Sequence, residues 1–361
     1  MDAMPNDRGP FTFAMAGGGT GGHVIPSIAV ARELKQIGHE VFFIGTRQGM
    51  EAKLVPAAGF PIDWIEISGL KRVGGRQTLA AITRLPFSIL AARNLLRKRR
   101  AAAVFSMGGY VAAPVMAAAR MLKLPLAIME PNAIPGVTNR RLGRIARKVL
   151  LTFEDAKSYF PNQDVEVTGL PVRAEFFLPE SPRNTGRKLT VLVTGGSQGS
   201  RTLNQACEQA WPKLHNIRLI HQTGAVHYKA IAERFEKTTV DGEVVPFIEA
   251  MPKTFSDVDV VVCRSGAGAV SELAAAGKPS ILVPFPYAAD DHQAKNAQAL
   301  ERIGAARFVR DQEMTGDRLI SELHALTPET LLKMSAAARD FARPDAARRA
   351  AEILIELAVH G

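Results

Sequence analysis

The sequence contains one pattern twice: an apolar run, a glycine-rich turn and then a helical stretch. The first copy is FTFAMAGGGTGGH at residues 11–23, and the second is LTVLVTGGSQGS at residues 189–200. A strand that leads through a glycine turn into a helix opens a doubly wound α/β domain. The repeated pattern therefore predicts two similar Rossmann-like domains with parallel sheets. Ligands of such sheets bind at the carboxyl ends of the strands, so a cleft between the domains is the expected site.

Short apolar runs alternate with helical stretches after each copy, which is typical of parallel α/β folds. The segment 171–188 is rich in proline and lacks periodicity, which predicts a linker. The expected domains are residues 1–170 and 189–343, and a helix over 344–361 is expected to pack back on the first domain. The expected strands are 12–16, 41–44, 62–65, 103–106, 126–129 and 149–152, then 189–193, 218–221, 244–247, 258–263, 280–284 and 307–309.

The positive charge of the chain lies in its first part. The net charge is +10, but residues 1–150 hold 21 basic and 8 acidic side chains (+13), and the remainder holds 24 and 27 (−3). Basic and apolar residues mix over 71–100, which favours an element drawn to an anionic membrane surface. Nucleic acid is a weaker alternative because stacking aromatics are scarce there. An ordinary solvated helix face is the third interpretation.

Several segments bear on the cellular compartment. Cys207 and Cys263 are too few for a disulfide framework, and we expect buried, inert thiols. Residues 101–119 carry no charge, but Gly108-Gly109 and Pro114 interrupt them, which predicts a strand, a turn and a helix. No signal-peptide pattern opens the sequence. We therefore expect a cytoplasmic protein without a membrane span.

The glycine turns are suited to phosphate, because glycine permits close backbone approach and helix N-termini attract anions. Gly17, Gly19 and Gly22 match the dinucleotide spacing G-x-G-x-x-G. The acidic residue expected after the second strand is absent, and Thr46-Arg47 stands there. Arg47 would allow a 2′-phosphate, so a dinucleotide oxidoreductase remains an alternative.

Polar residues at strand ends are candidates for chemistry. His23 either caps its own turn or, as a neutral imidazole, accepts a proton. Glu130 and Asn132 suit sugar hydroxyls or proton transfer, with helix capping as the alternative for Asn132. Glu272 either holds a ribose or is a solvated helix residue. The D-x-D at Asp257–Asp259 precedes a strand, at the wrong end of the sheet, so no metal site is expected.

Seven motifs in a fixed order carry a family resemblance. They are GGGTGGHVIPSIAVA, SGL at 68–70, SMGGY at 106–110, MEPN at 129–132, GLPVR at 169–173, GGSQG, and CRSGAGAVSELAAAGKP from residue 263. Together they closely resemble the MurG family of peptidoglycan glycosyltransferases, which have the GT-B fold.

The resemblance implies an inverting hexosyltransferase that moves N-acetylglucosamine from UDP-N-acetylglucosamine to the C4 hydroxyl of the N-acetylmuramoyl unit of lipid I. The product, lipid II, serves cell wall biogenesis, cell shape and cell division. The family implies a peripheral protein on the cytoplasmic face of the inner membrane that needs no tightly bound metal or other cofactor. The second domain would bind the donor and the first the acceptor.

The resemblance also implies site residues. His23 is the first choice of general base and Glu130 the second. The expected substrate contacts are Thr20, Gly21 and Gly22 near the donor sugar and diphosphate, Asn132 at the N-acetylglucosamine, Arg173 and Ser197 at the UDP end, Ile248 at uracil, Ala267, Gly268, Ala269, Val270 and Ser271 at the phosphates, Glu272 at the ribose, and Gln293 at sugar hydroxyls. Met129, Pro131 and Leu170 depart from the usual H-E-Q-N and G-N-P-V-R patterns.

Two further alternatives stay open. A UDP-N-acetylglucosamine 2-epimerase would share the architecture and the donor, but the basic stretch at 71–100 speaks against it. A membrane- or nucleic-acid-binding protein without catalysis would not need three ligand-type glycine turns.

Overall fold

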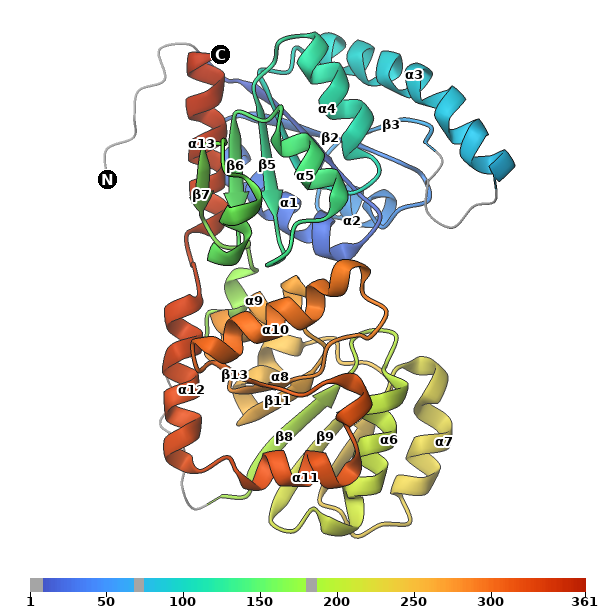
Figure 1. The fold of residues 1–361 in the computed structure, drawn as a ribbon, viewed down its shortest axis with the longest axis vertical. Coiled ribbons are helices and arrows are strands. Elements are labelled where there is room, and N and C mark those ends of the chain that lie inside the picture. Colours follow the sequence, from blue (N-terminus) through green and yellow to red (C-terminus); the bar gives the residue numbers. More distant parts are fainter. Residues whose placement is uncertain (1–8, 68–74, 180–186) are drawn as a thin grey trace. The chain divides into compact units, whose positions relative to one another are not determined.

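The structure, a computed structural model, describes residues 9–67, 75–179 and 187–361, with the backbone alone for 75–84. The chain forms two compact units (Figure 1). Unit 1 comprises Met1–Pro171 and Asp345–Gly361, and unit 2 comprises Val172–Pro344. The SGL motif at 68–70 lies outside the described residues, as do Lys71 and Arg72 of the basic stretch.

Unit 1 is built on a seven-stranded parallel sheet in the order β3-β2-β1-β4-β5-β6-β7. The six expected strands are confirmed, whereas the sequence did not predict β7, a short edge strand with a glutamate at its centre. The strands are β1 Thr12–Gly17, β2 Glu40–Gly45, β3 Ile62–Trp64, β4 Ala103–Gly108, β5 Leu126–Glu130, β6 Lys148–Leu151 and β7 Val165–Val167.

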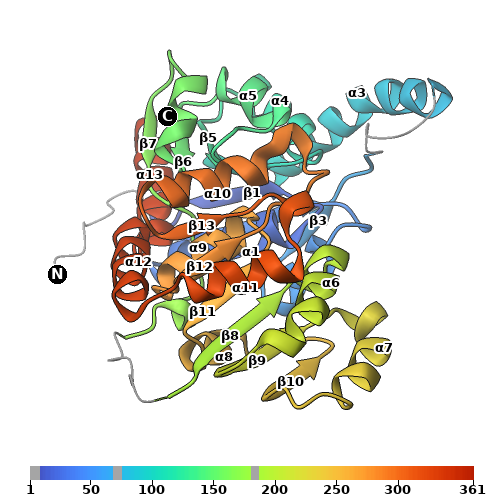
Figure 2. The same cartoon turned by 60° about the horizontal axis from the view of Figure 1, so that its bottom comes forward.

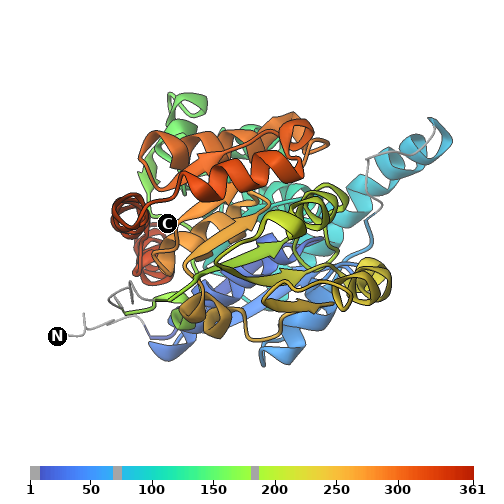
Figure 3. The same ribbon diagram turned by 90° about the horizontal axis from the view of Figure 1, so that it is seen from below.

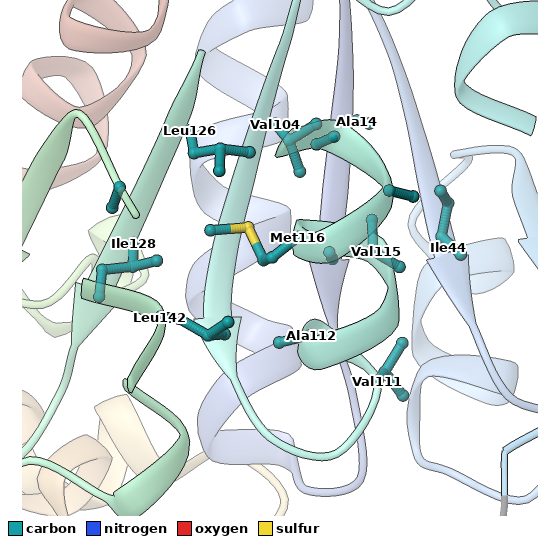
Figure 4. Close-up of a cluster of buried hydrophobic side chains, with 14 of the residues drawn as sticks. Ala14, Ile44, Val104, Val111, Ala112, Val115, Met116, Leu126, Ile128 and Leu142 are labelled. Carbon is teal, nitrogen blue, oxygen red and sulfur yellow. The ribbon is translucent and has the colours of Figure 1, made fainter. Parts of the chain in front are cut away.

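Helices cover this sheet on both faces (Figure 1). Figure 4 shows one interface, where Val115 and Met116 of α4 pack between side chains of β1, β4 and β5. The uncharged run 101–119 is thus a buried strand, a turn and a helix, as predicted. The helices of unit 1 are α1 Gly21–Gln36, α2 Glu51–Ala57, α3 Gly75–Lys98, α4 Ala112–Met121, α5 Val137–Gly143, the 3₁₀ helix η1 Glu154–Tyr159 and α13 Ala346–His360.

The last helix, α13, belongs to unit 1, where it packs against α1 and β4. Ile353 and Leu354 of α13 are fully buried. Arg349 holds the helix to the edge strand β7, because its Nε donates to Glu166 Oε1 at 2.7 Å and its Nη2 to Glu166 Oε2 at 3.1 Å. The end of the chain therefore completes the unit that its beginning forms.

Unit 2 has a six-stranded parallel sheet in the order β10-β9-β8-β11-β12-β13. In Figure 2 the strands β8, β9 and β10 lie side by side, with α7 next to β10. The strands are β8 Leu189–Thr194, β9 Ile217–Gln222, β10 Gly242–Val245, β11 Val260–Cys263, β12 Ser280–Leu282 and β13 Ala306–Phe308. The expected strand at 244–247 ends earlier because Pro246 lacks the N–H that a ladder needs.

The helices of unit 2 surround its sheet. They are the 3₁₀ helices η2 Ala174–Phe176, η3 Trp211–Lys213, η4 Ala289–Asp291 and η5 Asp311–Glu313, with α6 Arg201–Ala210, α7 Ala225–Phe235, α8 Met251–Asp257, α9 Ala267–Ala275, α10 His292–Arg302, α11 Gly316–His324 and α12 Pro328–Phe341. Phe176 of η2 is buried against Phe255, with ring centroids 5.5 Å apart. Residues 172–179 of the expected linker are therefore packed structure of unit 2, and 180–186 lie outside the described residues.

The strand orders place the glycine turns beside the point in each sheet where the strand order reverses. In both sheets the strand order reverses between two central strands, β1 and β4 in unit 1 and β8 and β11 in unit 2. Ligands of doubly wound sheets bind at the carboxyl ends of such strands. The turns at 17–22, 108–110, 195–199 and 264–266 each follow one of these four strands.

Helix α3 differs from the other helices of unit 1. Its first turns extend away from the rest of the unit in Figures 2 and 3 (cyan). In its described second half, Phe87 is 73% exposed and Leu90 is 48% exposed. No helix within the described ranges is both long and apolar enough to cross a membrane.

Candidate functional site

The first glycine turn of unit 1 joins β1 to α1. Thr20 and Gly22 are exposed, and Gly21 and His23 are half-buried in the first turn of α1. The Nδ1 atom of His23 lies 3.5 Å from the Gly18 carbonyl oxygen, and the ring also lies beside Gly109 of the second turn. The structure thus brings the candidate base to the place where both glycine turns of unit 1 meet.

Glu51 reaches this turn from α2, although the sequence did not single it out. Its side chain is fully buried. Oε2 accepts a hydrogen bond from Gly19 N at 2.8 Å, and Oε1 accepts from Thr46 N at 3.0 Å and from Thr46 Oγ1 at 2.9 Å. One N–H of the glycine turn therefore points inward at a carboxylate and is not offered to a ligand.

Glu130, the second candidate base, is fully engaged at the end of β5. Oε1 accepts from Asn132 N at 2.9 Å and from Asn132 Nδ2 at 3.1 Å. Oε2 accepts from Gly136 N at 3.2 Å and from Asn139 Nδ2 at 2.8 Å. Burial raises the pKa of Glu130 to about 7, against the opposing effect of these hydrogen bonds. The geometry suits a carboxylate that orients Asn132 better than one that meets a substrate.

In unit 2, Arg173 and Glu272 are brought together. Arg173 Nη2 lies 3.7 Å from Glu272 Oε1, and the guanidinium also stacks 4.8 Å from the centre of the Phe176 ring. Burial raises the pKa of Glu272 to about 7, while the charge of Arg173 opposes this shift. Glu272 is therefore not an ordinary solvated helix residue, although the sequence left that interpretation open.

Other expected donor contacts in unit 2 lie on one turn and at the starts of two helices. Ser197 is exposed on the turn after β8. Residues 267–269 are half-buried in the first turn of α9, whereas Val270 and Ser271 are buried. Gln293, at the start of α10, uses its Oε1 to accept a hydrogen bond from Phe285 N at 2.9 Å.

Gln222 connects two of these turns, and the sequence gave no reason to select it. Its Nε2 donates to the Gly196 carbonyl at 2.9 Å and to Thr194 Oγ1 at 3.0 Å. Its Oε1 accepts from Ile248 N at 2.8 Å. One buried amide thus joins the turn after β8 to the segment expected to contact uracil.

Arg264 is a second such connector in unit 2. Its Nη2 donates to Ser200 Oγ at 2.6 Å, and its Nη1 donates to the Pro284 carbonyl at 2.9 Å and to Asp311 Oδ1 at 2.5 Å. These bonds tie the carboxyl ends of β11 and β12 to the start of α6. The motif containing Arg264 was recognised from the sequence, but this bracing role was not.

The D-x-D segment directly precedes β11, as predicted, although Asp257 is the last residue of α8 and not part of a loop. Asp259 Oδ2 accepts from Thr190 N at 2.8 Å, and Oδ1 accepts from Arg187 Nη2 at 2.8 Å. Across the part of the chain that the structure describes, no three His, Cys, Asp or Glu side chains converge as metal ligands would. Cys207 and Cys263 are buried, and burial raises the pKa of both thiols.

The two doubly wound units, with glycine turns at both switch points, set the architecture against which the family comparison is made. Residues 13–151 match the N-terminal domain of glycosyltransferase family 28, and residues 190–350 match its C-terminal domain. The chain therefore belongs to glycosyltransferase family 28, with a fold of the GT-B type.

Individual relatives define the position within the family. The chain is 55% identical over 352 residues to the UDP-N-acetylglucosamine–N-acetylmuramyl-(pentapeptide) pyrophosphoryl-undecaprenol N-acetylglucosamine transferase of Solibacter usitatus, covering 96% of each chain. It is 44% identical to the Methylococcus capsulatus protein of the same name, covering 94% of this chain and 96% of the relative. The crystal structure of Acinetobacter baumannii MurG matches with a TM-score of 0.82 and 32% identity, over 96% of this chain and 100% of that one.

A more distant neighbour shares the fold alone. The Neisseria meningitidis UDP-GlcNAc 2-epimerase, solved with UDP-GlcNAc, has a TM-score of 0.70 at 15% identity, covering 96% of this chain and 100% of that one. The epimerase alternative is thus similar in architecture, whereas the sequence relationship favours the transferase. Family membership likewise disfavours the dinucleotide oxidoreductase.

Proposed function

We propose that the chain transfers N-acetylglucosamine from UDP-N-acetylglucosamine to the C4 hydroxyl of the N-acetylmuramoyl unit of lipid I, which makes lipid II. The observation that carries this proposal is the 55% identity, over 96% of both chains, to a relative named for this transfer. The matches to both family domains support it.

On this proposal unit 1 takes the acceptor, and His23 is the general base. Inverting transfer needs one group that removes the proton from the attacking hydroxyl. The imidazole of His23 is held between the two glycine turns of unit 1. Glu130 acts as a positioning residue, because its Oε1 atom accepts hydrogen bonds from both the backbone N–H and the side-chain amide of Asn132.

Unit 2 takes the donor, and its charges suit a departing nucleoside diphosphate. Arg173 supplies a cation, and the N-termini of α6 and α9 supply backbone N–H groups with positive helix ends. Glu272 accepts the ribose hydroxyls, and the backbone at Ile248 contacts uracil. Gln293, Ser197 and residues 267–271 complete the donor contacts.

Unit 1 associates with the cytoplasmic face of the inner membrane through α3. Its exposed Phe87 and Leu90 lie on the same helix as Arg93, Arg97 and Lys98. Apolar side chains that enter the headgroup region and cations that meet anionic lipid together make an interfacial anchor.

The test is UDP release from UDP-N-acetylglucosamine, measured with and without a short-chain lipid I analogue. Acceptor-dependent release with formation of a β-1,4-linked disaccharide is the expected result. Formation of UDP-N-acetylmannosamine without acceptor would instead identify an epimerase. Failure to bind or turn over the donor would overturn the proposal.

A further inference from the structure

Glu51 is a buried carboxylate that no motif of the sequence contains. It is the first residue of α2, directly after β2 and its loop, and its side chain is fully buried. A buried charge is costly unless hydrogen bonds satisfy it. Two backbone N–H groups and one hydroxyl donate to its two oxygens, from Gly19 and Thr46.

The surrounding backbone is shaped to admit this carboxylate. Gly18, Gly45 and Gly49 all face the Glu51 side chain, and a Cβ added at any of the three would collide with it. Gly18 lies in the turn after β1, whereas Gly45 ends β2 and Gly49 lies in the loop that follows β2. Their lack of side chains is therefore what allows the carboxylate to lie beneath the turn at 17–22.

The contacts continue to the second glycine turn of the unit. The Thr46 hydroxyl donates to Glu51, so the Tyr110 hydroxyl is the donor in the 3.0 Å bond between Tyr110 OH and Thr46 Oγ1. The Tyr110 ring in turn lies against Gly19, 3.1 Å from where a Cβ of Gly19 would be. Gly19, Glu51, Thr46 and Tyr110 thus form a closed ring of contacts across the loops after β1, β2 and β4.

We propose that Glu51 is a positioning residue for the transfer reaction: it fixes the turn at 17–22, and through this turn it sets the place of His23. The link to His23 is the Gly18 carbonyl, whose oxygen lies 3.5 Å from Nδ1 and which belongs to the same peptide group as the Gly19 N–H that Glu51 holds. This inference rests on the proposed function, in which His23 removes the acceptor proton. Glu51 itself touches no substrate.

The test is Glu51→Gln, which keeps the size but replaces one acceptor oxygen with an amide NH₂. That NH₂ faces an N–H donor, so the turn loses a partner. We expect kcat for acceptor-dependent transfer to fall about tenfold or more, with UDP affinity changed less than about twofold. Amide hydrogen exchange in a peptide covering residues 14–23 should accelerate, while a peptide covering 195–200 in unit 2 should not change.

Controls separate this role from a general loss of folding. Glu154→Gln alters an exposed carboxylate of the same unit that pairs with Lys157, and it should leave all three readouts unchanged. In a Trp211→Phe background Trp64 is the single tryptophan, so its fluorescence reports on the fold of unit 1. Where Glu51→Gln fails to fold, Thr46→Val decides, because it removes the hydroxyl that donates to Glu51 Oε1 and that also joins Tyr110, and so loosens the carboxylate that holds Gly19 N.

The variants also distinguish failure of the Glu51 proposal from failure of the proposed function. Thr46→Val should lower kcat on its own but add nothing to Glu51→Gln, since both act through one network. A folded Glu51→Gln protein that transfers at the wild-type rate, or additive effects of the two changes, would overturn the role of Glu51. Absence of transfer in the wild-type protein would overturn the proposed function instead, and the exchange experiment would still test whether Glu51 holds the turn.

Discussion

Arg173 Nη2 lies 3.7 Å from Glu272 Oε1, so the cation proposed for the leaving group touches the carboxylate proposed for the ribose. Both side chains are partly exposed, at 42% and 28%, and such a pair contributes little to stability by itself. The pair matters because Glu272 gains or loses its proton near neutral pH, since burial raises the pKa of Glu272 to about 7. We therefore expect the proposed donor site to change charge near neutral pH.

This titration predicts pH-dependent donor binding. The ionised carboxylate accepts ribose hydroxyls better than the protonated form does, and its fraction rises with pH through the pKa. We expect UDP affinity to increase by up to about tenfold between about pH 6 and about pH 8. Calorimetry on the wild type and Glu272→Gln checks this, since UDP's own ionisation affects both alike. Equal pH slopes in the two proteins would show that Glu272 does not bind the nucleotide.

The role of His23 predicts a split between turnover and binding. His23→Ala should reduce kcat by a factor on the order of 100 or more, because the acceptor hydroxyl loses its base. UDP affinity should stay within about twofold, since His23 belongs to unit 1. The exposed His324 of unit 2 gives the control variant His324→Ala. A parallel loss of UDP affinity and turnover would rule out the assignment as base.

The bonds of Gln222 predict that one substitution weakens the donor site at two places. Gln222→Leu leaves Ile248 N and the Gly196 carbonyl without the partner that joins them. We expect UDP affinity to fall about tenfold, because these two backbone groups then lack the hydrogen bonds that fix the positions of their segments. Gln312→Leu, at an exposed position on η5, is the matched control. Unchanged UDP affinity in folded Gln222→Leu would mean that the two turns keep their shape without the bridge.

Burial of Glu130 predicts a pH dependence of folding. Its pKa is raised from 4.5 to about 7 in the folded protein, so the native state holds the proton more tightly. The resulting stabilisation is complete below the unfolded pKa and is lost as pH rises through about 7. Between about pH 5 and about pH 8, Glu130 should lower the free energy of unfolding of unit 1 by roughly 2 kcal/mol.

Denaturant unfolding followed by Trp64 fluorescence in the Trp211→Phe background measures this loss. The free energy of unfolding is compared between the Glu130 and Glu130→Gln proteins at both pH values, so that the contributions of other titrating groups cancel. The loss should be smaller in Glu130→Gln. If the free energy of unfolding of both proteins depended on pH in the same way, the pH dependence would come from other groups and not from Glu130.

The exposed apolar residues of α3 predict membrane binding by unit 1. Phe87→Ser should reduce sedimentation with vesicles that contain anionic phosphatidylglycerol, because Phe87 is 73% exposed. Val226 of unit 2 is 84% exposed, and Val226→Ser is the matched control. Binding should also weaken with added salt, since the cations of α3 meet anionic headgroups. An equal effect of the two variants would argue against a specific role of α3.

The sequence predicted those parts of the molecule that depend on local pattern. Apolar runs and glycine turns are local, so twelve of the thirteen strands in the described part of the chain, and all four switch-point turns, were anticipated. The missed strand β7 is only three residues long with a central glutamate, and it is held by the distant Arg349. No pattern of residues around position 165 indicates that Arg349 will pair with Glu166.

The connecting side chains were missed for the same reason. Glu51 and Gln222 act over separations of 32 and 26 residues, on Gly19 and on Gly196 and Ile248. A helical glutamate and a glutamine at a strand end look ordinary until the fold brings their partners close. Glu130 was found because it lies within a recognised motif, whereas the four N–H groups that donate to it, two from Asn132 and one each from Gly136 and Asn139, could not be read from the motif.

The packing of α13 on α1 has a consequence for synthesis of the protein. The chain begins in unit 1, runs through all of unit 2 and returns with α13. On the ribosome, the face of α1 that α13 covers stays uncovered while residues 172–344 are being made. Unit 2 has all of its residues available earlier, so the second unit in sequence can finish folding first. Unit 1 must wait for the helix that begins at Ala346.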